Sequence, residues 1–493
     1  MSQPLPLAER GDSTLTRPHV PDRPLESRTR APLRSENEHE TLGHRLYGAN
    51  VVTLLGRDAA TVRPAVRAVR AGRWKCRFID PYAFWFSISY ICYFALRLAT
   101  ESVVSREDFT YFYVCGAAVI VLAYLITDPN AIPSFWQVFG FASYVAVRYA
   151  MGRGSGNSEI QQISVFQYCS PTLFFVLGYQ IWRRGWFDRL VLVFSVLSAV
   201  SLAVGLYQHF FGGLEDFFLK TALDKAVVAG EVERRCSSLA GNSLATAFLA
   251  AVCLLCAVGR RRRSFSIMLV AGVSLLATLS RGGVVMTAIG LACRLLARAR
   301  RYRIRSSRFI APILAGLALL GILGYLADSR AGNVYSARLM DTFNIREGGN
   351  ASRVESWEVA FAMWWTNPVF GAGLGQLGAS PVKYGFAQLA PESTYLKILG
   401  ETGIAGMILY LLAVLPPVIG AIRKARVDTP SAAERAQRDV SVVLAILGGG
   451  LFLQNTEYDF FAGIFWLWLG GLAAYTRCGI QSSAEVPLCT ATK

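Results

Sequence analysis

Charged residues and histidines are scarce in this sequence. Asp, Glu, Lys and Arg make up 17% of the 493 residues, against 53% hydrophobic residues, and there are four histidines. The apolar residues form long uninterrupted blocks, which are typical of a polytopic membrane protein and not of a soluble core. The net charge of +17 therefore predicts an oriented membrane protein that binds no nucleic acid, because the arginines flank these blocks.

Several kinds of site lack their usual signature. The ten cysteines are scattered and form no disulfide framework. Cys253 and Cys256 have C-x-x-C spacing, but their apolar surroundings favour small buried hydrophobes over a redox or metal site. The predicted outer side has no close D-x-D pair and no histidine cluster, which argues against an obligatory metal, and we expect no cofactor. Glycines 371, 373 and 375 follow no strand, so we interpret them as a flexible connection and not as a dinucleotide fingerprint.

The apolar blocks predict an all-α fold with about twelve transmembrane helices. Arginine-rich segments lie between even and odd spans at 182–189, 259–264, 294–308 and 423–438, all on one side. The positive-inside rule makes that side cytoplasmic, with both termini, as expected for the bacterial inner membrane. The predicted spans are 80–97, 109–127, 132–148, 163–182, 188–208, 241–259, 264–280, 282–297, 309–327, 402–422, 438–454 and 459–476.

This topology divides the chain into five parts. Residues 1–78 form a basic, largely disordered cytoplasmic tail without a recognisable secretory signal, and its end at 61–78 is amphipathic and suited to the membrane surface. The remaining parts are nine spans over 79–327, a large periplasmic loop with short helices over 328–401, three spans over 402–476 and a cytoplasmic tail over 477–493.

Arg281 interrupts the apolar stretch between two arginine-rich segments. The stretch must cross the membrane twice, and each arm of about 16 residues reaches only about 24 Å. We therefore place Ser280, Arg281, Gly282 and Gly283 at the tip of a short hairpin near the outer surface, where the glycines allow a tight turn. The guanidinium of Arg281 either snorkels to lipid phosphates or grips the phosphates of a lipid-linked substrate.

A second outer element is predicted by the segment 350–377. Ser352 and Glu355 have the spacing of a capping box, and Pro368 ends the segment, which indicates an external helix of about four turns. Arg353 then lies in its first turn, where an anion would feel both the guanidinium and the helix N-terminus, or where Arg353 pairs with a nearby acid. The helical spacing of four apolar residues predicts the face that packs on the membrane domain: Val354, Trp357, Phe361 and Trp364.

Four further features lie on the predicted outer side. Glu392 begins an external helix that leads into the tenth span, where a carboxylate is more often a cap than a catalyst, and Glu401 is interpreted as a local structural acid. Arg234 and Arg235 precede the sixth span. Glu457 and Asp459 lie at the tip of the last external hairpin, and either the arginines or these acids could contact lipid head groups.

Together these motifs resemble the O-antigen ligase and O-antigen polymerase superfamily. The resemblance rests on TLSRGG at 278–283, SRVESW and NPVFGAGLGQ within 352–376, ESTYLKILGETGIAGMILY at 392–410 and, more weakly, RRCSSLAGNSLATAFLA at 234–250. It implies a helical membrane glycosyltransferase that moves a glycan from undecaprenyl diphosphate to an acceptor hydroxyl on the periplasmic face. It also implies that Arg281 and Arg353 match the arginines that hold the diphosphate, and that Arg235 matches a basic position before Gly241 and Asn242.

One departure from the family pattern affects the expected reaction. O-antigen ligases carry a histidine where this chain has Glu392, and three of its four histidines lie in the N-terminal tail. This favours a metal-independent polymerase of surface polysaccharide repeat units, with a ligase acting on lipid A core or protein as the alternative. A transporter or flippase is less favoured, because the sequence has no internal repeat with broken helices. A nonenzymatic assembly subunit is the remaining alternative.

The predicted site combines three catalytic residues with a set of substrate contacts. Glu392 is the expected base, and Arg281 and Arg353 are the expected diphosphate ligands. The expected partners are the undecaprenyl-linked donor, a glycan or lipid acceptor, the lipid bilayer, and a chain-length regulator and flippase of the same pathway. The predicted substrate contacts are Arg234, Arg235, Asn242, Ser280, Gly282, Trp357, Tyr395 and Asp459.

Overall fold

The computed structural model divides the chain into two compact units, Met1–Val69 and Arg70–Lys493, and the residues it describes belong to the second. The predicted N-terminal tail up to residue 78, the predicted ninth span and Glu392 lie outside the described residues. These are 79–93, 95–96, 106–127, 135–152, 158–211, 225–228, 231–234, 236–258, 264–278, 280–302, 348–377, 391, 393–451 and 459–477.

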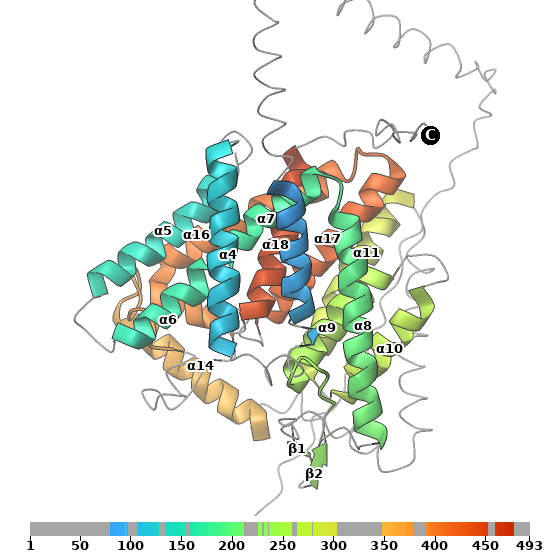
Figure 1. Cartoon of the computed structure of the whole chain (residues 1–493). Helices are drawn as coiled ribbons and strands as arrows, with labels where there is room; N and C mark the ends of the chain where they lie inside the picture. The colour runs from blue at the N-terminus through green and yellow to red at the C-terminus, as the bar shows by residue number, and fades with distance from the viewer. Residues whose placement is uncertain are drawn as a thin grey trace, which may run out of the picture. The chain divides into compact units, whose positions relative to one another are not determined.

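The described part of the chain is predominantly helical, which confirms the predicted helical class (Figure 1). A first helix covers 79–93. The further helices are α4 (Arg106–Thr127), α5 (Phe135–Gly152), α6 (Ser158–Cys169), α7 (Thr172–Arg183), α8 (Phe187–Phe211), α9 (Ser243–Ala257), α10 (Phe265–Ala277), α11 (Arg281–Tyr302), α14 (Gly348–Thr366), α16 (Thr394–Lys424), α17 (Pro430–Gly449) and α18 (Asp459–Arg477).

The fold is not wholly α-helical. Two short strands, β1 (Lys225–Val228) and β2 (Glu231–Arg234), form an antiparallel hairpin in the predicted outer segment before α9. Lys225 pairs with Arg234, and Val228 pairs with Glu231. The all-α class therefore stands, with one unpredicted hairpin whose strands are too short to show a clear period of alternating residues.

Two described helices, α8 and α16, are long and apolar enough to cross a membrane. Three shorter apolar helices lie at Tyr111–Thr127, Ser243–Ala257 and Phe265–Ala277. The count of twelve spans is therefore not confirmed. The predicted fourth span is also divided, because α6 ends at Cys169 and α7 begins at Thr172, after Pro171. Proline disfavours helical geometry in the residue before it, which explains this break.

The core forms where small residues let helices approach closely. A Cβ atom on Gly178 in α7 would collide with the backbone of Leu467 in α18, and one on Gly470 in α18 would collide with the backbone of Phe175. Beside this contact, the buried Trp468 ring lies 5.5 Å from Phe187 and 5.4 Å from Phe194 of α8. Close backbone approach through small residues is the usual way in which helices associate within a membrane.

Candidate functional site

Arg281 is the first residue of α11. The N–H of Gly283 donates to Oγ of the buried Ser280 at 3.4 Å, so Ser280 caps this helix. A Cβ on Gly283 would lie 2.8 Å both from Cβ of Ala247 in α9 and from Cδ1 of Leu275 in α10. The predicted break in the hairpin is confirmed, because α10 ends at Ala277 and α11 begins at Arg281, but the glycines do not form the turn. They lie in the first turn of α11 and allow it to pack closely against its neighbours.

The start of α9 lies beside the start of α11. Asn242 caps α9, because its Oδ1 accepts from the N–H of Ala245 at 2.6 Å. The N–H of Cys236 donates to the carbonyl of Ala277 at the end of α10, at 2.9 Å. Burial raises the pKa of the Cys236 thiol to about 12. The segment that follows β2 is thus fixed against α10, with Arg234 as the last residue of β2, while Arg235 lies outside the described residues.

The C-terminal end of α17 connects α11 with α16. The Tyr395 hydroxyl donates to the carbonyl of Leu447 at 2.6 Å, and the N–H of Thr394 donates to the carbonyl of Gly450 at 2.8 Å. On the other side, a Cβ on Gly449 would collide with the Met286 side chain of α11. The first turn of α16 and the second turn of α11 therefore pack on the same end of α17. The Tyr395 hydroxyl, a predicted substrate contact, serves this helix contact.

Ser393 caps α16 and directly follows the predicted catalytic Glu392. Its Oγ accepts from the N–H of Leu396 at 3.5 Å. Ser393 is therefore the N-cap of α16, the structural role that a carboxylate such as Glu392 more often has at a helix start. Asp459, another predicted contact, is the first residue of α18, and two residues later Phe461 stacks on Phe248 of α9 with ring centroids 4.0 Å apart. The start of α18 therefore lies near the start of α9.

The predicted external helix is present as α14, but two details were wrong. It begins at Gly348, so Ser352 lies within the helix and not at its N-cap, and Arg353 lies in the second turn. Arg353 is half-buried, and its carbonyl accepts from Ser356 Oγ at 2.7 Å. The N-terminal helix effect expected at Arg353 is therefore lost, because that effect is confined to the first turn.

The packing face of α14 also differs from the prediction. Among the side chains of α14 that the structure describes, Ser356 and Ala360 are buried, whereas Phe361, predicted to pack inward, is 50% exposed. The Ala360 carbonyl lies against Gly400 of α16. Small residues at this contact permit a close approach, so the helix turns its large residues partly outward. The other predicted packing residues, Val354, Trp357 and Trp364, are half-buried.

The segment after α14 is fixed and not a flexible connection. Gly371, Gly373 and Gly375 have positive φ angles of 75°, 114° and 77°, which only glycine adopts readily. The N–H of Ala372 donates to the carbonyl of Gly400 at 2.7 Å, and that of Gly373 donates to the carbonyl of Glu401 at 3.2 Å. We name residues 367–377 the glycine loop; it is hydrogen-bonded along α16.

Glu401, interpreted from the sequence as a local structural acid, joins the glycine loop to the bundle and so acts beyond its own helix. This fully buried carboxylate accepts from the Leu377 N–H at 3.0 Å and from the Tyr168 hydroxyl at 2.9 Å. One turn earlier, the buried Lys397 ammonium donates to Gln167 Oε1 at 3.1 Å and lies 5.6 Å from the centre of the Tyr168 ring. We name these four residues and Leu377 the Glu401 cluster. Charged residues within an apolar segment were the available signal for it.

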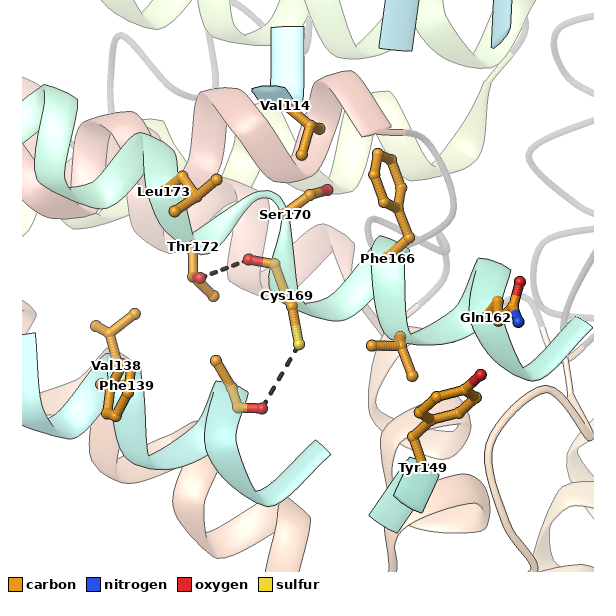
Figure 2. A pocket seen from close by; sticks show the side chains of 12 residues that line it. Val114, Val138, Phe139, Tyr149, Gln162, Phe166, Cys169, Ser170, Thr172 and Leu173 are labelled. Atoms are coloured by element: carbon orange, nitrogen blue, oxygen red, sulfur yellow. Dashed lines mark hydrogen bonds between the residues drawn. The ribbon is translucent and has the colours of Figure 1, made fainter. Parts of the chain in front are cut away.

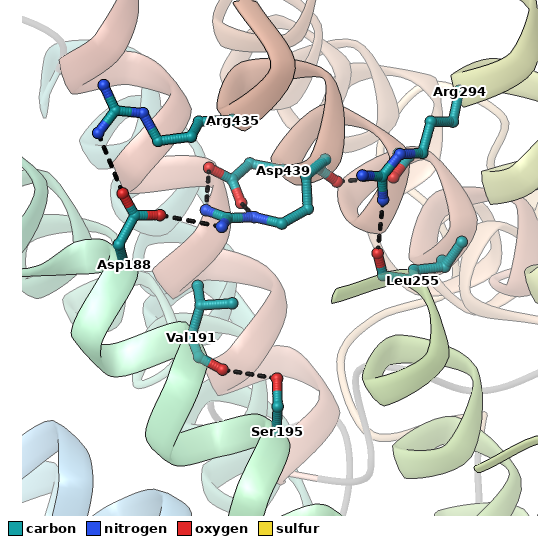
Figure 3. A network of polar contacts seen from close by, with 9 residues as sticks. Asp188, Val191, Ser195, Leu255, Arg294, Arg435 and Asp439 are labelled. Carbon is teal, nitrogen blue, oxygen red and sulfur yellow. Dashed lines mark hydrogen bonds and ion pairs between the residues drawn. The ribbon is translucent and has the colours of Figure 1, made fainter. Parts of the chain in front are cut away.

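A second charged cluster joins α8, α9, α11 and α17 (Figure 3). The buried Arg438 bonds Asp439 through Nε at 2.8 Å and Asp188 through an NH group at 2.9 Å. Arg435 also pairs with Asp188, at 3.1 Å, and Arg294 donates to the Leu255 carbonyl at 2.8 Å. We name these side chains the arginine cluster. Sequence reasoning used the arginines of this region only to orient the chain.

A largely apolar cavity of about 410 Å³ lies between α4, α5, α6 and α7 (Figure 2). Two of its polar groups form local bonds: the Thr172 hydroxyl donates to the Cys169 carbonyl at 2.6 Å, and the Cys169 thiol donates to the Ala142 carbonyl at 3.5 Å. No predicted site residue lines it. Within the described part of the chain, no group of three His, Cys, Asp or Glu side chains is placed to hold a metal ion.

The region from α10 to α16 is similar to a known protein family. Residues 266–411 match the family model described as O-antigen ligase. The matched segment begins in α10 and ends in α16, so it contains Arg281, Arg353, the glycine loop and Glu401. A comparison with curated proteins finds no match.

Proposed function

We propose, from the premise that this chain belongs to the O-antigen ligase-like superfamily, that it polymerises undecaprenyl-diphosphate-linked oligosaccharide repeat units on the periplasmic face of the membrane. One observation carries the proposal. The first turn of α16 and the second turn of α11 pack on the same end of α17, so the backbone of Arg281 and the residue after Glu392 both lie near this end. Met286, which contacts Gly449, is only about 7.5 Å along the helix axis from Arg281.

The reaction requires cations for the leaving group. Transfer of a glycan from undecaprenyl diphosphate leaves negative charge on the phosphates and needs no general acid. Arginine suits this task, because its permanently charged guanidinium donates two parallel hydrogen bonds to phosphate. Arg281 also begins a helix of 22 residues, whose N-terminal dipole favours an anion. We assign Arg281 and Arg353 to the diphosphate, with Arg234 and Arg235 as further cations.

The reaction also requires a base for the acceptor hydroxyl. We assign this role to Glu392, which accepts the hydroxyl proton as oxygen attacks the anomeric carbon and the bond to the diphosphate breaks. The next residue, Ser393, is fixed by its capping bond, and Thr394 is held by the Gly450 carbonyl at 2.8 Å. A carboxylate attached to this rigid helix start suits a base that must be placed accurately.

Ligation is the second candidate, favoured by the description of the matched family as O-antigen ligase. Both reactions break the same bond, and they differ in the acceptor, which is a second lipid-linked glycan for a polymerase and lipid A core or protein for a ligase. We favour polymerisation because Glu392 stands where O-antigen ligases carry a histidine. A chain-length regulator and a flippase would be functional partners of either enzyme.

Deletion of the gene in its host tests the assignment. For a polymerase, the mutant accumulates single repeat units, whereas for a ligase it accumulates long lipid-linked chains. Complementation with Arg281→Ala, Arg353→Ala or Glu392→Ala should leave the polymer lost, while Arg281→Lys should restore a small part. Arg298→Ala is the matched control, because Arg298 forms an exposed pair with Glu434 away from the proposed site.

Two outcomes would overturn the proposal. Normal polymer with all three alanine variants, at membrane levels like those of the wild type, would indicate a nonenzymatic subunit. Movement of lipid-linked glycan across vesicles by the purified protein, without a new glycosidic bond, would indicate a transporter.

A further inference from the structure

One side of α16 is an exposed apolar stripe. Its members recur at helical spacing over about 22 Å, most of the thickness of a membrane core. Because α16 is one of the two described helices able to span a membrane, this stripe defines a surface that faces lipid. The stripe consists of Ile404, Ile408, Leu412, Leu415 and Ile419.

A second exposed apolar surface lies on α14 and the glycine loop. Trp365 is 75% exposed, and Phe361, Val369 and Phe370 are each about half exposed. We name these four residues the aromatic patch. The exposed acids of the same helix, Glu355 and Glu358, precede the patch in sequence, so one half of α14 is apolar on its open side and the other half is charged. Exposed apolar patches with a polar border mark interaction surfaces.

The aromatic patch is continuous with the stripe on α16. The N–H of Ile404 donates to the Pro368 carbonyl at 2.9 Å, and that of Ala405 donates to the Val369 carbonyl at 3.2 Å. The first member of the stripe is therefore bonded directly to the loop that carries half of the patch. Figure 1 shows α14 running at a large angle to α4, across one end of the helices and not along them. The patch thus borders the end of a lipid-facing surface.

A cation accompanies the aromatic rings at this border. The Arg148 guanidinium of α5 lies 5.7 Å from the centre of the Phe370 ring, and it also donates to the Gly371 carbonyl at 3.4 Å. Tryptophan and other aromatic rings with an arginine nearby are the residues enriched at the level of lipid head groups. Exposure of the three large aromatic rings of the patch to water would be unfavourable, because apolar surface is more stable when it is removed from water.

We propose that the aromatic patch docks on the lipid bilayer at the membrane interface and holds the C-terminal half of α14 against the bilayer. The occupant of this surface is lipid, because the patch continues a lipid-facing stripe and ends where the acids of α14 begin. The inference does not depend on the proposed reaction. It concerns how the external helix is held.

Tryptophan fluorescence of the full chain in lipid nanodiscs tests the proposal. The nanodiscs contain phosphatidylcholine and phosphatidylglycerol, with acyl chains either brominated near the head group or unbrominated. The chain has ten tryptophans, so the Trp365 signal is obtained as the difference between wild type and Trp365→Phe. We expect this signal to lose most of its intensity in brominated lipid and little with aqueous iodide.

Trp468→Phe provides the control, because Trp468 is fully buried in the core. Its difference signal should be quenched by neither agent. Quenching of Trp365 by iodide and not by bromine would place the patch in water and overturn the proposal. Quenching by neither agent would mean that protein covers the patch and would also overturn it. Phe370→Trp is the independent second variant, and it should add a component that brominated lipid quenches.

Discussion

The arginine cluster and the Glu401 cluster each contain a buried charged side chain, Arg438 and Glu401, but the described bonds of these two side chains differ. Arg438 forms ion pairs with the carboxylates of Asp439 and Asp188, so its described bonds join charges of opposite sign. The described bonds of Glu401 come from a phenol hydroxyl and a backbone N–H, and the buried Lys397 lies one turn earlier on the same helix. The first arrangement fixes helices to one another. The second fixes the backbone of a loop, which lies inside the segment that matches the O-antigen ligase family.

Arg438→Met should give the largest loss of stability, because it leaves Asp439 buried without its guanidinium partner. Removing one member of a buried pair costs about 3 to 5 kcal/mol. The melting temperature of the detergent-solubilised protein should fall sharply. The matched control is Arg435→Met, whose pair with Asp188 is nearly half exposed on both sides and should contribute at most about 1 kcal/mol. Equal melting temperatures for the two variants would contradict the distinction between the buried and exposed arginines.

Gly371→Ala should give the next largest effect, at the other cluster. Its φ of 75° disfavours a side chain, and a Cβ there would lie 2.5 Å from the carbonyl carbon of Glu401. Strain and overpacking together should cost about 2 to 4 kcal/mol.

Gly373→Ala separates these two causes. Gly373 has a φ of 114°, but a Cβ there would meet nothing within 4 Å, so this variant carries only the backbone strain. The melting temperature should therefore fall less for Gly373→Ala than for Gly371→Ala. A larger fall for Gly373→Ala would mean that the glycine loop does not pack on α16 as described.

Several helix positions could be predicted from the sequence, because each long apolar block marks a helix directly. The predicted span 109–127 is α4, and the hairpin arms around Ser280 are α10 and α11. The break inside the predicted span 163–182 was missed although Pro171 marked it. The mean hydropathy of a long apolar segment stays high across a single proline, so it does not reveal such a break. The β-hairpin had no comparable signal.

The contacts of the candidate site could not be predicted in the same way. Glu401 bonds Tyr168, 233 residues earlier in the chain, and no local pattern specifies such a pair. The face of α14 was assigned by placing large residues inward, but the close contact with Gly400 selects Ala360 instead. Small residues set these helix contacts, and a search for large apolar residues overlooks them.

Tyr168→Phe should give the smallest effect and the most specific one. Phenylalanine keeps the ring beside the Lys397 ammonium, so the variant removes only the hydroxyl that donates to Glu401 at 2.9 Å. A lost hydrogen bond to a buried charge should cost about 1.5 kcal/mol, measured as a shift in melting temperature. Because Glu401 also holds the Leu377 N–H, the variant should loosen the glycine loop and lower polymer formation in cells more than it lowers membrane abundance.

Tyr124→Phe is the matched control, because the Tyr124 hydroxyl donates to Asp80 at the same distance of 2.9 Å. Asp80 also forms an ion pair with Arg184 at 2.7 Å, and this ion pair remains after the tyrosine hydroxyl is removed. We expect a smaller shift in melting temperature than for Tyr168→Phe, and polymer formation that follows abundance. If both variants lowered polymer only in proportion to abundance, the tyrosine at Glu401 would serve stability alone, as the tyrosine at Asp80 does. A selective loss with Tyr168→Phe would instead tie the hydrogen bond between Tyr168 and Glu401 to the placement of the loop.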